Sequence, residues 1–524
     1  MAPHLMTQAT EALAAGAAAA SSPTASRRLV RSSSLLLSGR LLSMAVNFGA
    51  QVLIVRHLSQ TAYGGFAYAI SIASMAQSVV ALGFERALVR FLPIDHERRD
   101  YGRLFGTMGL AFGTVLGLGL VLVAAVHVFH RSLAASGFAN PQAFSLILIL
   151  VFLVPVQAID EMLVSLFAVF ANPRSIFLRK HILAPGLRLV VAVALVATGG
   201  DVFFLARSYL IAGVAGVALY TILLVRELSR MGLWLHFDRR TVRLPWAEIF
   251  AFSLPLLSTD LVYTVMHTMD AVMLEHFHGS ASVAALRAVQ PAARLNEFVL
   301  FSFTLLFSPV AARLFAREDG EGIRDLYWQT AAWVAVLTFP VFVATTLLSR
   351  PLTVLLFGAR YEQSALLLAL LACGYYFSAA VGLNGLTLRV YGKVRYLVGI
   401  NVATAAINLI ANLLLIPRFG ATGAAAGTLV ALVVHNVLKQ AGLGLWTPVR
   451  VFDRRYARVY ATIAVSALGL FAVQLLLHPP ILVSVGAAAV ASLGVLRASG
   501  RMLRVEHTFP ELLRLPGARL ILSR

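Results

Sequence analysis

The chain has 524 residues, of which 59% are hydrophobic and only 13% are charged. Soluble domains carry roughly twice that charged fraction, so the composition excludes a soluble globular protein and indicates a polytopic membrane protein. The formal net charge of +20 indicates contact with anionic lipid headgroups rather than a nucleic-acid surface. The single cysteine, Cys373, excludes a disulfide framework and a cysteine-based metal site.

Apolar segments follow one another along almost the whole chain and predict about fourteen transmembrane helices. Most are near the ~20 residues that a helix needs to cross the hydrocarbon core. Helices are the only option, because backbone amides in lipid must be bonded within the segment. In chain order, the expected spans are residues 34–55, 66–88, 104–128, 143–166, 181–199, 203–225, 247–268, 283–309, 328–348, 364–387, 397–416, 421–443, 457–477 and 481–498.

Basic residues fix the predicted orientation of these spans. About four in five of the 43 Lys and Arg residues fall on one face when the spans are threaded back and forth, a strong positive-inside signal. We therefore expect both termini in the cytoplasm. Residues 1–26 lack a basic region before an apolar core, which favours a cytoplasmic tail over a cleaved signal peptide. The preference for Arg over Lys is typical of a GC-rich bacterial genome, so the expected location is the bacterial inner (plasma) membrane.

The loops argue against an enzyme. The longest connection, residues 226–246, is too short to fold into a catalytic domain by itself. No Walker, GxSxG or HExxH motif is present. We therefore predict no enzymatic activity, no catalytic residues, no cofactor and no metal site, and movement of a solute across the bilayer as the default function.

A weak internal repeat divides the chain into two halves. Residues 51–59 align with 271–279, and residues 101–105 with 323–327, at a spacing of about 220 residues. Six helices separate the copies, so the halves share one orientation and are related by an axis along the membrane normal. The predicted fold is all-α, with two six-helix lobes and two further C-terminal helices. The expected divisions are a disordered cytoplasmic N-terminal tail at 1–33, an N-lobe at 34–225, a cytoplasmic linker at 226–246, a C-lobe at 247–443, spans thirteen and fourteen at 457–498, and a basic cytoplasmic tail at 499–524.

Short motifs carry a resemblance to a known family. Residues 51–93 place Tyr63-Gly64 in a short outer loop, and Leu82-Gly83 through Arg90-Phe91 at the end of the following span. The segments 270–290 and 356–361 (LFGARY) are similar to the family's start of span eight and a later outer loop. Over about residues 34–500 the chain resembles the polysaccharide (Wzx-like) flippases of the multidrug/oligosaccharidyl-lipid/polysaccharide exporter superfamily. Val283-Ala284-Ala285 departs from the Val-Gly-x-Tyr that is usual there.

The resemblance implies a flippase that moves an undecaprenyl-pyrophosphate-linked oligosaccharide from the inner to the outer leaflet during surface polysaccharide biosynthesis. The implied partners are that lipid, membrane lipids, a polysaccharide polymerase and chain-length proteins, with no nucleic acid. The sequence leaves two alternatives open. One is an ion-coupled drug or cation antiporter of the same superfamily, which would favour an acidic cavity. The other is a scaffold or membrane enzyme of polysaccharide assembly.

Charged residues within spans mark the candidate site, because each costs roughly 2.5–3.5 kcal/mol in the bilayer. Span eight carries four polar residues that helical spacing puts on one face: Arg287, Gln290, Arg294 and Glu297. Two arginines on that face could bind a pyrophosphate bidentately. The alternative is an internal Arg294–Glu297 pair that locks helix packing.

Spans one and seven present matching polar faces. They carry, respectively, Arg40, Ser43, Asn47 and Gln51, and Asp260, Tyr263, His267 and Asp270. At the repeat spacing Arg40 falls on Asp260, so both faces are expected to line one cavity. Asp260 is a candidate proton or Na⁺ site or the partner of a neighbouring arginine, and Glu297 is the second candidate for ion coupling. His267 and Asp270 are expected at a solvated outer rim. The predicted substrate-binding residues are Arg287, Arg294, Arg40, Gln290 and Asn47.

Overall fold

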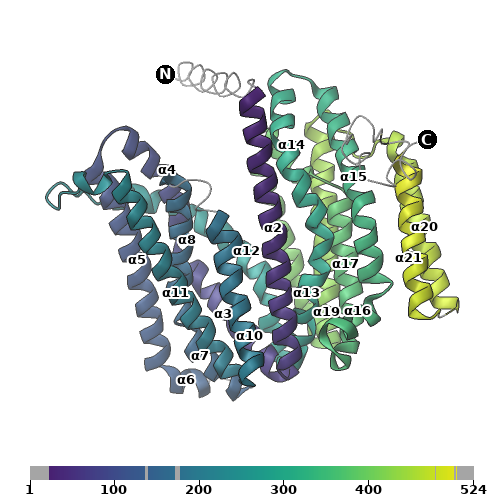
Figure 1. Cartoon of the computed structure of the whole chain (residues 1–524), viewed down its shortest axis with the longest axis horizontal. Coiled ribbons are helices and arrows are strands. Elements are labelled where there is room, and N and C mark those ends of the chain that lie inside the picture. The colour runs from purple at the N-terminus through teal and green to yellow at the C-terminus, as the bar shows by residue number, and fades with distance from the viewer. Residues whose placement is uncertain (1–22, 136–139, 171–176, 478, 501–502, 504–524) are drawn as a thin grey trace.

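The computed structural model describes residues 23–135, 140–170, 177–477, 479–500 and 503, and the remainder is drawn in grey in Figure 1. Every regular element in the described residues is a helix, as predicted. In chain order they are α2 Pro23–His57, α3 Gln60–Ala81, α4 Phe84–Glu97, α5 Tyr101–Val128, α6 His130–Ala135, α7 Pro141–Leu150, α8 Leu153–Phe170, the π-helix η1 Leu178–Leu183, α10 Ala184–Thr198, α11 Val202–Arg230, the 3₁₀ turn η2 Leu233–His236, α12 Trp246–His278, α13 Ser280–Arg294, the 3₁₀ turn η3 Leu295–Glu297, α14 Phe298–Ala316, α15 Gly320–Thr346, α16 Ser349–Phe357, the 3₁₀ turn η4 Ala359–Ser364, α17 Ala365–Ala380, α18 Asn384–Val390, α19 Val394–Trp446, the 3₁₀ turn η5 Arg454–Tyr456, α20 Ala457–Leu477 and α21 Ile481–Gly500.

The two predicted tails fall largely outside the described residues. Within the predicted N-terminal tail, residues 1–22 are not described, whereas residues 23–33 belong to α2. Of the predicted C-terminal tail, residues 499, 500 and 503 are described, and the first two belong to the end of α21. The prediction of disorder in residues 1–22 therefore stays a prediction.

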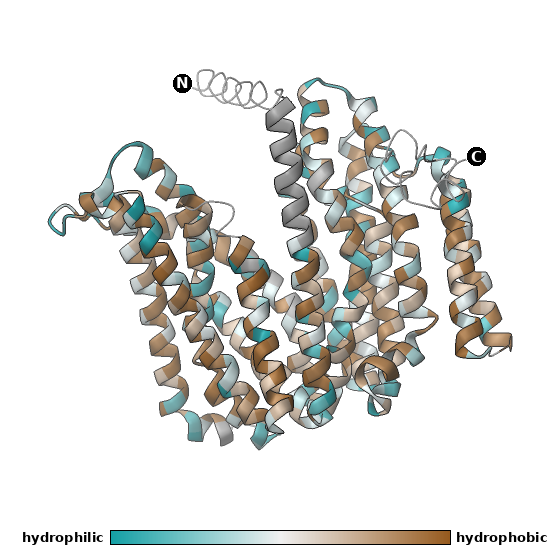
Figure 2. Cartoon of the chain, viewed as in Figure 1, coloured by the Kyte–Doolittle hydropathy of each residue, from teal (hydrophilic) through white to brown (hydrophobic). Residues whose placement is uncertain are grey.

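The chain is a multi-pass membrane protein. Among the described residues, 10 helices are long and apolar enough to cross a membrane, or up to 11 if one bent pair counts as a span. Hydrophobic residues dominate along the helices, and hydrophilic ones gather at their ends and in the loops (Figure 2). The number of fourteen spans stays a prediction. One reason for the lower count is α19, whose 53 residues break at Gly420 (φ 55°, ψ −133°), between the predicted spans 397–416 and 421–443.

Several helices begin where the sequence supplies an oxygen acceptor. A cap of this kind satisfies an orphan N–H group of the first turn and contributes typically about 1 kcal/mol. Ser59 caps α3 and Asp100 caps α5 by accepting a backbone N–H three residues later, and Asp201 and Asp319 cap α11 and α15 in the same way. These short polar signals explain why the spans start where they do.

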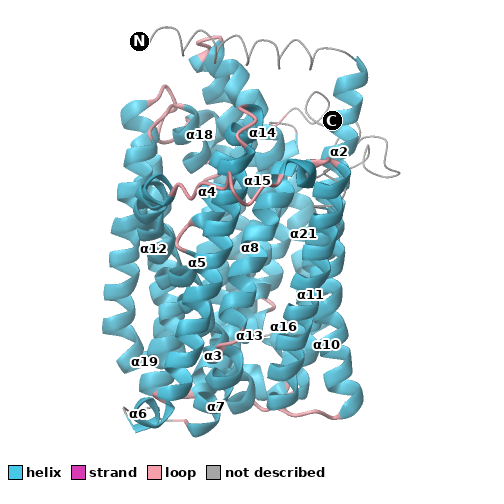
Figure 3. Ribbon diagram, turned by 90° about the vertical axis from the view of Figure 1, so that its left-hand side faces the viewer, coloured by secondary structure: helices cyan, strands magenta, loops and turns pink. Residues whose placement is uncertain are grey.

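The helices form two groups side by side (Figure 1). Helices α2 to α11 make up the N-lobe, α13 to α19 make up the C-lobe, and α12 lies between them. The pair α20–α21 lies at the edge of the C-lobe, away from the N-lobe. Both described ends of the chain lie at one face, here called the terminal face, and the short helices α6 and α7 lie at the opposite, far face (Figure 3).

Among the described residues, the lobes share an apolar core only at the far face. That core joins Val55 and Leu58 of the N-lobe to Val283 and Tyr361 of the C-lobe. Toward the terminal face the two lobes have separate cores, built around Phe84 and Leu88 in the N-lobe and around aromatic residues of α15 in the C-lobe. The lobes are therefore joined at the far face and separate at the terminal face.

Helix α12 starts within the N-lobe, although the sequence assigns it to the C-lobe. Ile249 is fully buried in the N-lobe core. Arg103 on α5 donates to Glu248 at 2.5 Å and pairs with Asp95 at 3.2 Å. The connection before α12 also lies on α5, where the Arg243 N–H donates to the Gly102 carbonyl at 3.1 Å. The linker is therefore fixed to the N-lobe.

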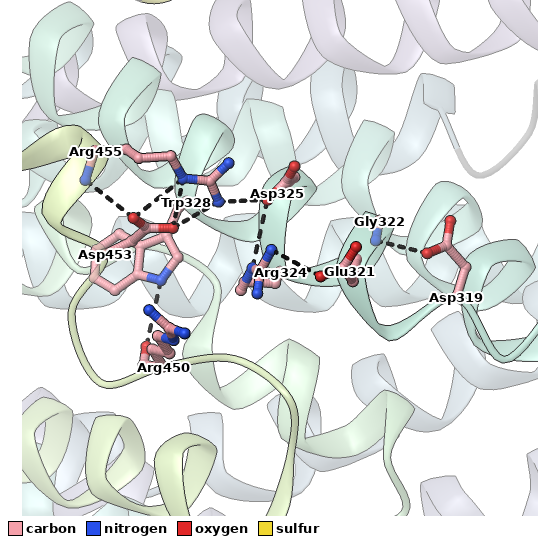
Figure 4. Close-up of polar contacts among 9 residues, drawn as sticks. All are labelled: Asp319, Glu321, Gly322, Arg324, Asp325, Trp328, Arg450, Asp453 and Arg455. Carbon is pink, nitrogen blue, oxygen red and sulfur yellow. Dashed lines mark hydrogen bonds and ion pairs between the residues drawn. The ribbon is translucent and has the colours of Figure 1, made fainter.

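A polar network at the terminal face attaches the segment that leads into α20 to the C-lobe (Figure 4). Arg455 pairs with Asp325 on α15 at 2.6 Å and with Asp453 at 2.7 Å. Beside it, the Trp328 indole N–H donates to the Arg450 carbonyl at 3.3 Å. Together with the apolar core that Trp333 of α15 shares with Ile463 of α20 and Val495 of α21, the network makes the C-terminal pair part of the C-lobe.

Candidate functional site: a polar cavity in the N-lobe

Arginines from each lobe close the far face. Arg56, at the end of α2, donates to the Leu355 carbonyl at the end of α16, 2.9 Å away. Arg360 of the C-lobe donates in return to the Val55 carbonyl in the last turn of α2, 2.8 Å away. Carbonyls at helix C-termini lack intrahelical partners and attract cations. Each lobe therefore caps a helix of the other, and Arg56 and Arg360 form what we call the far-face latch.

Close backbone contact reinforces this closure. A Cβ atom added to Gly64 on α3 would lie 1.7 Å from the Ser280 carbonyl oxygen at the start of α13. Only glycine fits there, because no side-chain carbon can approach a backbone oxygen so closely. Asn140 donates to the Ser280 hydroxyl at 2.8 Å beside this contact. Tyr63-Gly64, which carries part of the family resemblance, thus lies where the lobes meet.

A cavity of ≈ 480 Å³ opens within the N-lobe. Helices α2, α3, α8, α10 and α11 form its walls, and α13 of the C-lobe closes one side. Its polar wall consists mainly of amide, hydroxyl and charged side chains: Asn47, Gln51, Tyr63, Ser71, Gln157, Asp160, Arg188, Tyr209, Tyr220, Arg287 and Gln290. Alanine, glycine and branched aliphatic residues form the rest, together with Phe66 and Pro291. The mixture can hydrogen-bond a polyhydroxylated molecule and also accept a charged group.

Arg287 and Asp270 form a buried ion pair at the seam between the lobes. The Arg287 Nη2–Asp270 Oδ1 distance is 3.0 Å, and Arg287 also donates to Gln290 at 2.9 Å and to the Ser71 hydroxyl at 3.3 Å. Gln51 donates to the Arg287 carbonyl at 3.1 Å. Asp270 is only 4% exposed. The expected solvated rim at Asp270 is therefore wrong, because the arginine one helix away provides a partner that keeps the carboxylate buried.

Two other charged side chains belong to the N-lobe wall. Asp160 pairs with Arg179, whose guanidinium lies 3.6 Å above the Tyr220 ring. Arg188 on α10 donates to the Asn47 amide oxygen at 3.2 Å. Together with Arg287, the wall therefore carries three charged side chains: Asp160 is acidic, and Arg188 and Arg287 are basic.

The polar stripe of span eight is split by the structure. Arg287 and Gln290 share a face and line the N-lobe cavity. Helix α13 ends at Arg294, and a 3₁₀ turn follows through Glu297, so the regular helical spacing stops there. Arg294 instead donates to the Tyr375 hydroxyl of α17 at 3.1 Å. Glu297 lies in the field of Arg294 and Lys439 and bonds to Ser378.

The remaining predicted residues are also dispersed. Asn47 lines the N-lobe cavity, whereas Arg40 lies with its guanidinium 4.5 Å from the centre of the Phe301 ring on α14. The structure therefore brings together three of the five predicted substrate-binding residues, namely Arg287, Gln290 and Asn47. The side chains of Tyr263 and His267 lie outside what the structure describes.

Asp260 lies in a different pocket, of ≈ 330 Å³, between α3, α4, α8 and α12. Glu85, Glu161, Gln77 and several hydroxyl side chains share its lining, and Arg86 is ion-paired with Asp260. One of the two predicted roles, partner of a neighbouring arginine, is thus present. In the described residues, no three His, Cys, Asp or Glu side chains are grouped as a metal ion would require.

Arg188, Gln157 and Tyr209 were missed by sequence reasoning. A signal for Arg188 was present, because it is a charge inside predicted span five and such charges need a reason. Gln157 and Tyr209 gave no comparable signal, since their position on the cavity wall follows from tertiary packing.

Comparison with known proteins adds a family match and a fold. A sequence model for the family described as polysaccharide biosynthesis protein matches residues 53–366. An uncharacterised membrane protein of Methanocaldococcus jannaschii is 23% identical over 226 residues, which is 42% of this chain and 43% of that protein. The chain thus spans less than half the length of that relative.

Solved structures of other membrane transporters have a similar fold. The lipid II flippase MurJ, in an inward closed conformation, matches with a TM-score of 0.69 at 14% identity over 90% of this chain and 99% of its own. An inward-facing multidrug transporter of the MATE family and MOP superfamily matches with a TM-score of 0.59 at 14% identity, over 78% of this chain and 96% of its own. At these identities the likeness shows the fold alone.

Proposed function

Because the chain belongs to the polysaccharide biosynthesis protein family, we propose that it is a flippase for an undecaprenyl-pyrophosphate-linked oligosaccharide. The protein would move the head group of this lipid from the inner to the outer leaflet by alternating access. The observation that carries the proposal is the polar N-lobe cavity, which lies beside lobes that join at the far face and separate at the terminal face.

The chemistry of the cavity suits a glycan attached to a phosphate. Asn47, Gln51 and Gln290 offer amide donors and acceptors to sugar hydroxyls, and tyrosines add hydroxyls and ring faces. Ligand sites of this kind are concave, largely apolar and equipped with a few placed polar groups. The polyprenyl chain of the substrate would stay in the lipid beside the lobe.

We assign the terminal face to the cytoplasm and the membrane to the bacterial inner membrane, on the distribution of basic residues. The head group would enter from the cytoplasmic side, and rocking of the lobes would then break the far-face latch. Moving an anionic head group outward is favoured by an inside-negative potential, by ~2.3 kcal/mol per charge per 100 mV. The polymerase and chain-length proteins of polysaccharide assembly would act on the product.

The candidate substrate residues differ in the support that they receive. Arg287, Gln290 and Asn47 line the cavity and stay the first candidates. Arg294 and Arg40 lie on the C-lobe side, at Tyr375 and Phe301, and would act on a substrate that has reached the space between the lobes. Replacing Arg294 with Ala should abolish transport and leave membrane insertion normal. Full transport by that variant would remove Arg294 from the mechanism.

An ion-coupled cation antiporter is the second candidate, and one observation favours it. The Asp260 pocket contains three carboxylates, from Glu85, Glu161 and Asp260, a composition that attracts cations. Glu297, beside Lys439 and Arg294, is the other proposed coupling residue. In a flippase the same groups would couple the lobes to an ion gradient.

The experiment that separates these functions compares a deletion strain with its parent. Lipids are extracted, and the undecaprenyl-pyrophosphate oligosaccharide of each leaflet is measured with a membrane-impermeant glycosidase. The flippase predicts accumulation in the inner leaflet together with loss of surface polysaccharide. Unchanged lipid intermediates with new drug sensitivity would instead favour the antiporter and direct attention to Asp260.

A further inference from the structure

The three charged residues of the N-lobe cavity differ in whether a side chain of opposite charge neutralises them. Arg287 is paired with Asp270 at 3.0 Å, and Asp160 is paired with Arg179. Arg188 bonds to a neutral amide instead, and no carboxylate in the described part of the chain forms an ion pair with it. The cavity wall therefore keeps the positive charge of Arg188.

Asn47 orients the Arg188 side chain. The Asn47 amide nitrogen donates to the Ser43 carbonyl at 2.8 Å, so its oxygen is turned toward the Arg188 guanidinium 3.2 Å away. Arginine carries five N–H donors in a rigid fork. One of them is used by Asn47, and the exposed side chain leaves others directed to the cavity. A fork of this kind matches the paired oxygens of a phosphate or a carboxylate.

The depth of Arg188 makes its charge expensive. In the candidate span His181–Thr198, Arg188 lies seven residues after the start and ten before the end, about 10 and 15 Å from the two ends at 1.5 Å per residue. A cation at such depth costs roughly 2.5–3.5 kcal/mol unless water or a partner compensates it. A structural role would be met as well by a neutral residue, so the cost points to a ligand.

The C-lobe allows Arg188 to be compared with the residue at the equivalent position of the repeat. At the repeat spacing of about 220 residues, Arg188 falls on Asn408, which lines a much smaller C-lobe cavity of ≈ 50 Å³. The Asn408 oxygen accepts from Asn412 at 3.2 Å, so this amide serves internal packing. The charge thus occurs in the lobe that has room for a ligand and is replaced by an amide in the other.

We propose that Arg188, positioned by Asn47, binds an oxyanion of the transported head group within the N-lobe cavity. The oxyanion is a phosphate of the pyrophosphate bridge or the carboxylate of an acidic sugar. This assignment rests on the proposed flippase function and refines it. Arg287, which the sequence marks more strongly, then serves chiefly to hold the seam through Asp270.

The test uses the full chain in lipid nanodiscs with defined probes. Farnesyl pyrophosphate and farnesol form the first pair, which differs in the phosphate. A galacturonate trimer and a galactose trimer form the second pair, which differs in the carboxylate. Binding is measured for wild type, Arg188→Gln and Asn47→Asp. The Asn47→Asp side chain has nearly the same shape and would place its own carboxylate on Arg188. Arg207→Gln is the matched control, an exposed arginine of α11 outside the cavity wall.

We expect Arg188→Gln and Asn47→Asp to weaken binding of at least one anionic probe tenfold or more, with Arg207→Gln unchanged and the neutral probes unaffected. The probe whose binding is weakened identifies the oxyanion: a phosphate if it is farnesyl pyrophosphate, and a sugar carboxylate if it is the galacturonate trimer. Wild-type binding of both anionic probes by Arg188→Gln would overturn the assignment. An equal loss for Arg207→Gln would also overturn it, since the effect would then reflect net charge. Thermal unfolding of each variant checks that the fold is intact.

Failure of this assignment is distinguishable from failure of the flippase proposal. If the deletion strain accumulates the lipid intermediate but both variants bind the probes normally, the flippase stands and Arg188 does not read the head group. If the intermediate does not accumulate, the flippase proposal fails whatever Arg188 binds.

Discussion

The two lobes follow one plan but use their interiors differently. Spans one, two, four, five and six enclose ≈ 480 Å³ in the N-lobe, with one wall from α13, whereas the corresponding helices of the C-lobe enclose ≈ 50 Å³. The C-lobe core is filled by aromatic rings, among them Trp333, 1% exposed, and Tyr376, stacked on Phe342 at 4.2 Å. Small residues such as Ala212 and Gly216 line the N-lobe cavity instead. A repeat duplicates the helices, and side-chain volume decides which copy can hold a ligand.

The seam connects the two interiors. Gln290 lines both cavities, and Arg287 of α13, which lines the N-lobe cavity, pairs with Asp270 of α12, which lines the C-lobe cavity. The lobes are therefore linked by the hydrogen bond from Arg287 to Ser71 of α3 and, at the far face, by the latch and the Gly64 contact. Each prediction below changes one of these features.

The largest effect is expected where the backbones of the lobes touch. Gly64→Ala would place a methyl group 1.7 Å from the Ser280 carbonyl oxygen, so α3 and α13 must separate and the far face cannot close. We expect transport to be abolished, and distances between spin labels across the far face to lengthen. Gly65→Ala is the control, because its Cβ meets its nearest atoms at 3.5 Å or more. Closure in Gly64→Ala equal to that in Gly65→Ala would refute this reading of the contact.

Breaking the seam is expected to destabilise the protein strongly. Asp270→Ala leaves Arg287 buried beside the cavity without its carboxylate, and removal of one partner of a buried pair costs about 3–5 kcal/mol. The midpoint of thermal unfolding in detergent should fall accordingly. Arg230→Ala, which removes an exposed pair at Glu227, should change the midpoint little. Equal midpoints for the two variants would mean that the seam pair contributes no more than a surface pair.

Filling the two cavities should have opposite consequences. Gly216→Leu extends into the N-lobe cavity, where a Cβ meets only Leu187, at 3.6 Å. We expect transport to fall at least tenfold while stability is kept. Ala431→Leu enters the small C-lobe cavity and should destabilise by about 1–3 kcal/mol through overpacking. The comparison of the lobes is contradicted if the N-lobe variant transports normally.

A smaller effect is expected at the far-face latch. Arg360→Ala removes the bond to the Val55 carbonyl, and a hydrogen bond to a charged group contributes about 1.5–3 kcal/mol at most when exposed to water. The population with an open far face should rise about tenfold, since each 1.4 kcal/mol is a factor of ten, as measured by the same spin-label distances. Arg350→Ala, which removes a pair within the C-lobe at Glu362, serves as the control. No change in population would show that the latch does not favour closure.

The smallest effect concerns the terminal face of the C-lobe. Hydrogen bonds from Arg455 hold the pKa of Asp453 below its usual value of about 3.9. A lowered pKa in the folded state adds stability above that usual value, and the addition is lost as the pH falls through the folded pKa. The unfolding midpoint of wild type should therefore decline more steeply below about pH 4 than that of Asp453→Asn. Equal declines of the midpoint in wild type and Asp453→Asn would show that the Asp453–Arg455 pair does not contribute to the pH dependence of stability.

Much of the fold could be predicted because lipid imposes simple rules on sequence. The all-helical fold and the family resemblance were confirmed, the latter by the match over residues 53–366, whereas the number of fourteen spans stays a prediction. The candidate site was harder. The stripe through Arg287 and Arg294 assumed a continuous helix, but the turn at η3 divides it. The choice of partners, such as Asp270 for Arg287, depends on helix packing that spacing along the chain does not encode.

Cysteine accessibility tests most directly the claim that the N-lobe cavity holds the transported head group. With Cys373 replaced by Ser, single cysteines at Ala212 and Ala431 are exposed to a membrane-impermeant thiol reagent from the cytoplasmic side, with and without lipid-linked oligosaccharide. The account predicts labelling at Ala212→Cys, protection there by the lipid-linked oligosaccharide, and no labelling at Ala431→Cys. Labelling of both positions, or labelling at Ala212→Cys that the lipid does not protect, would contradict it.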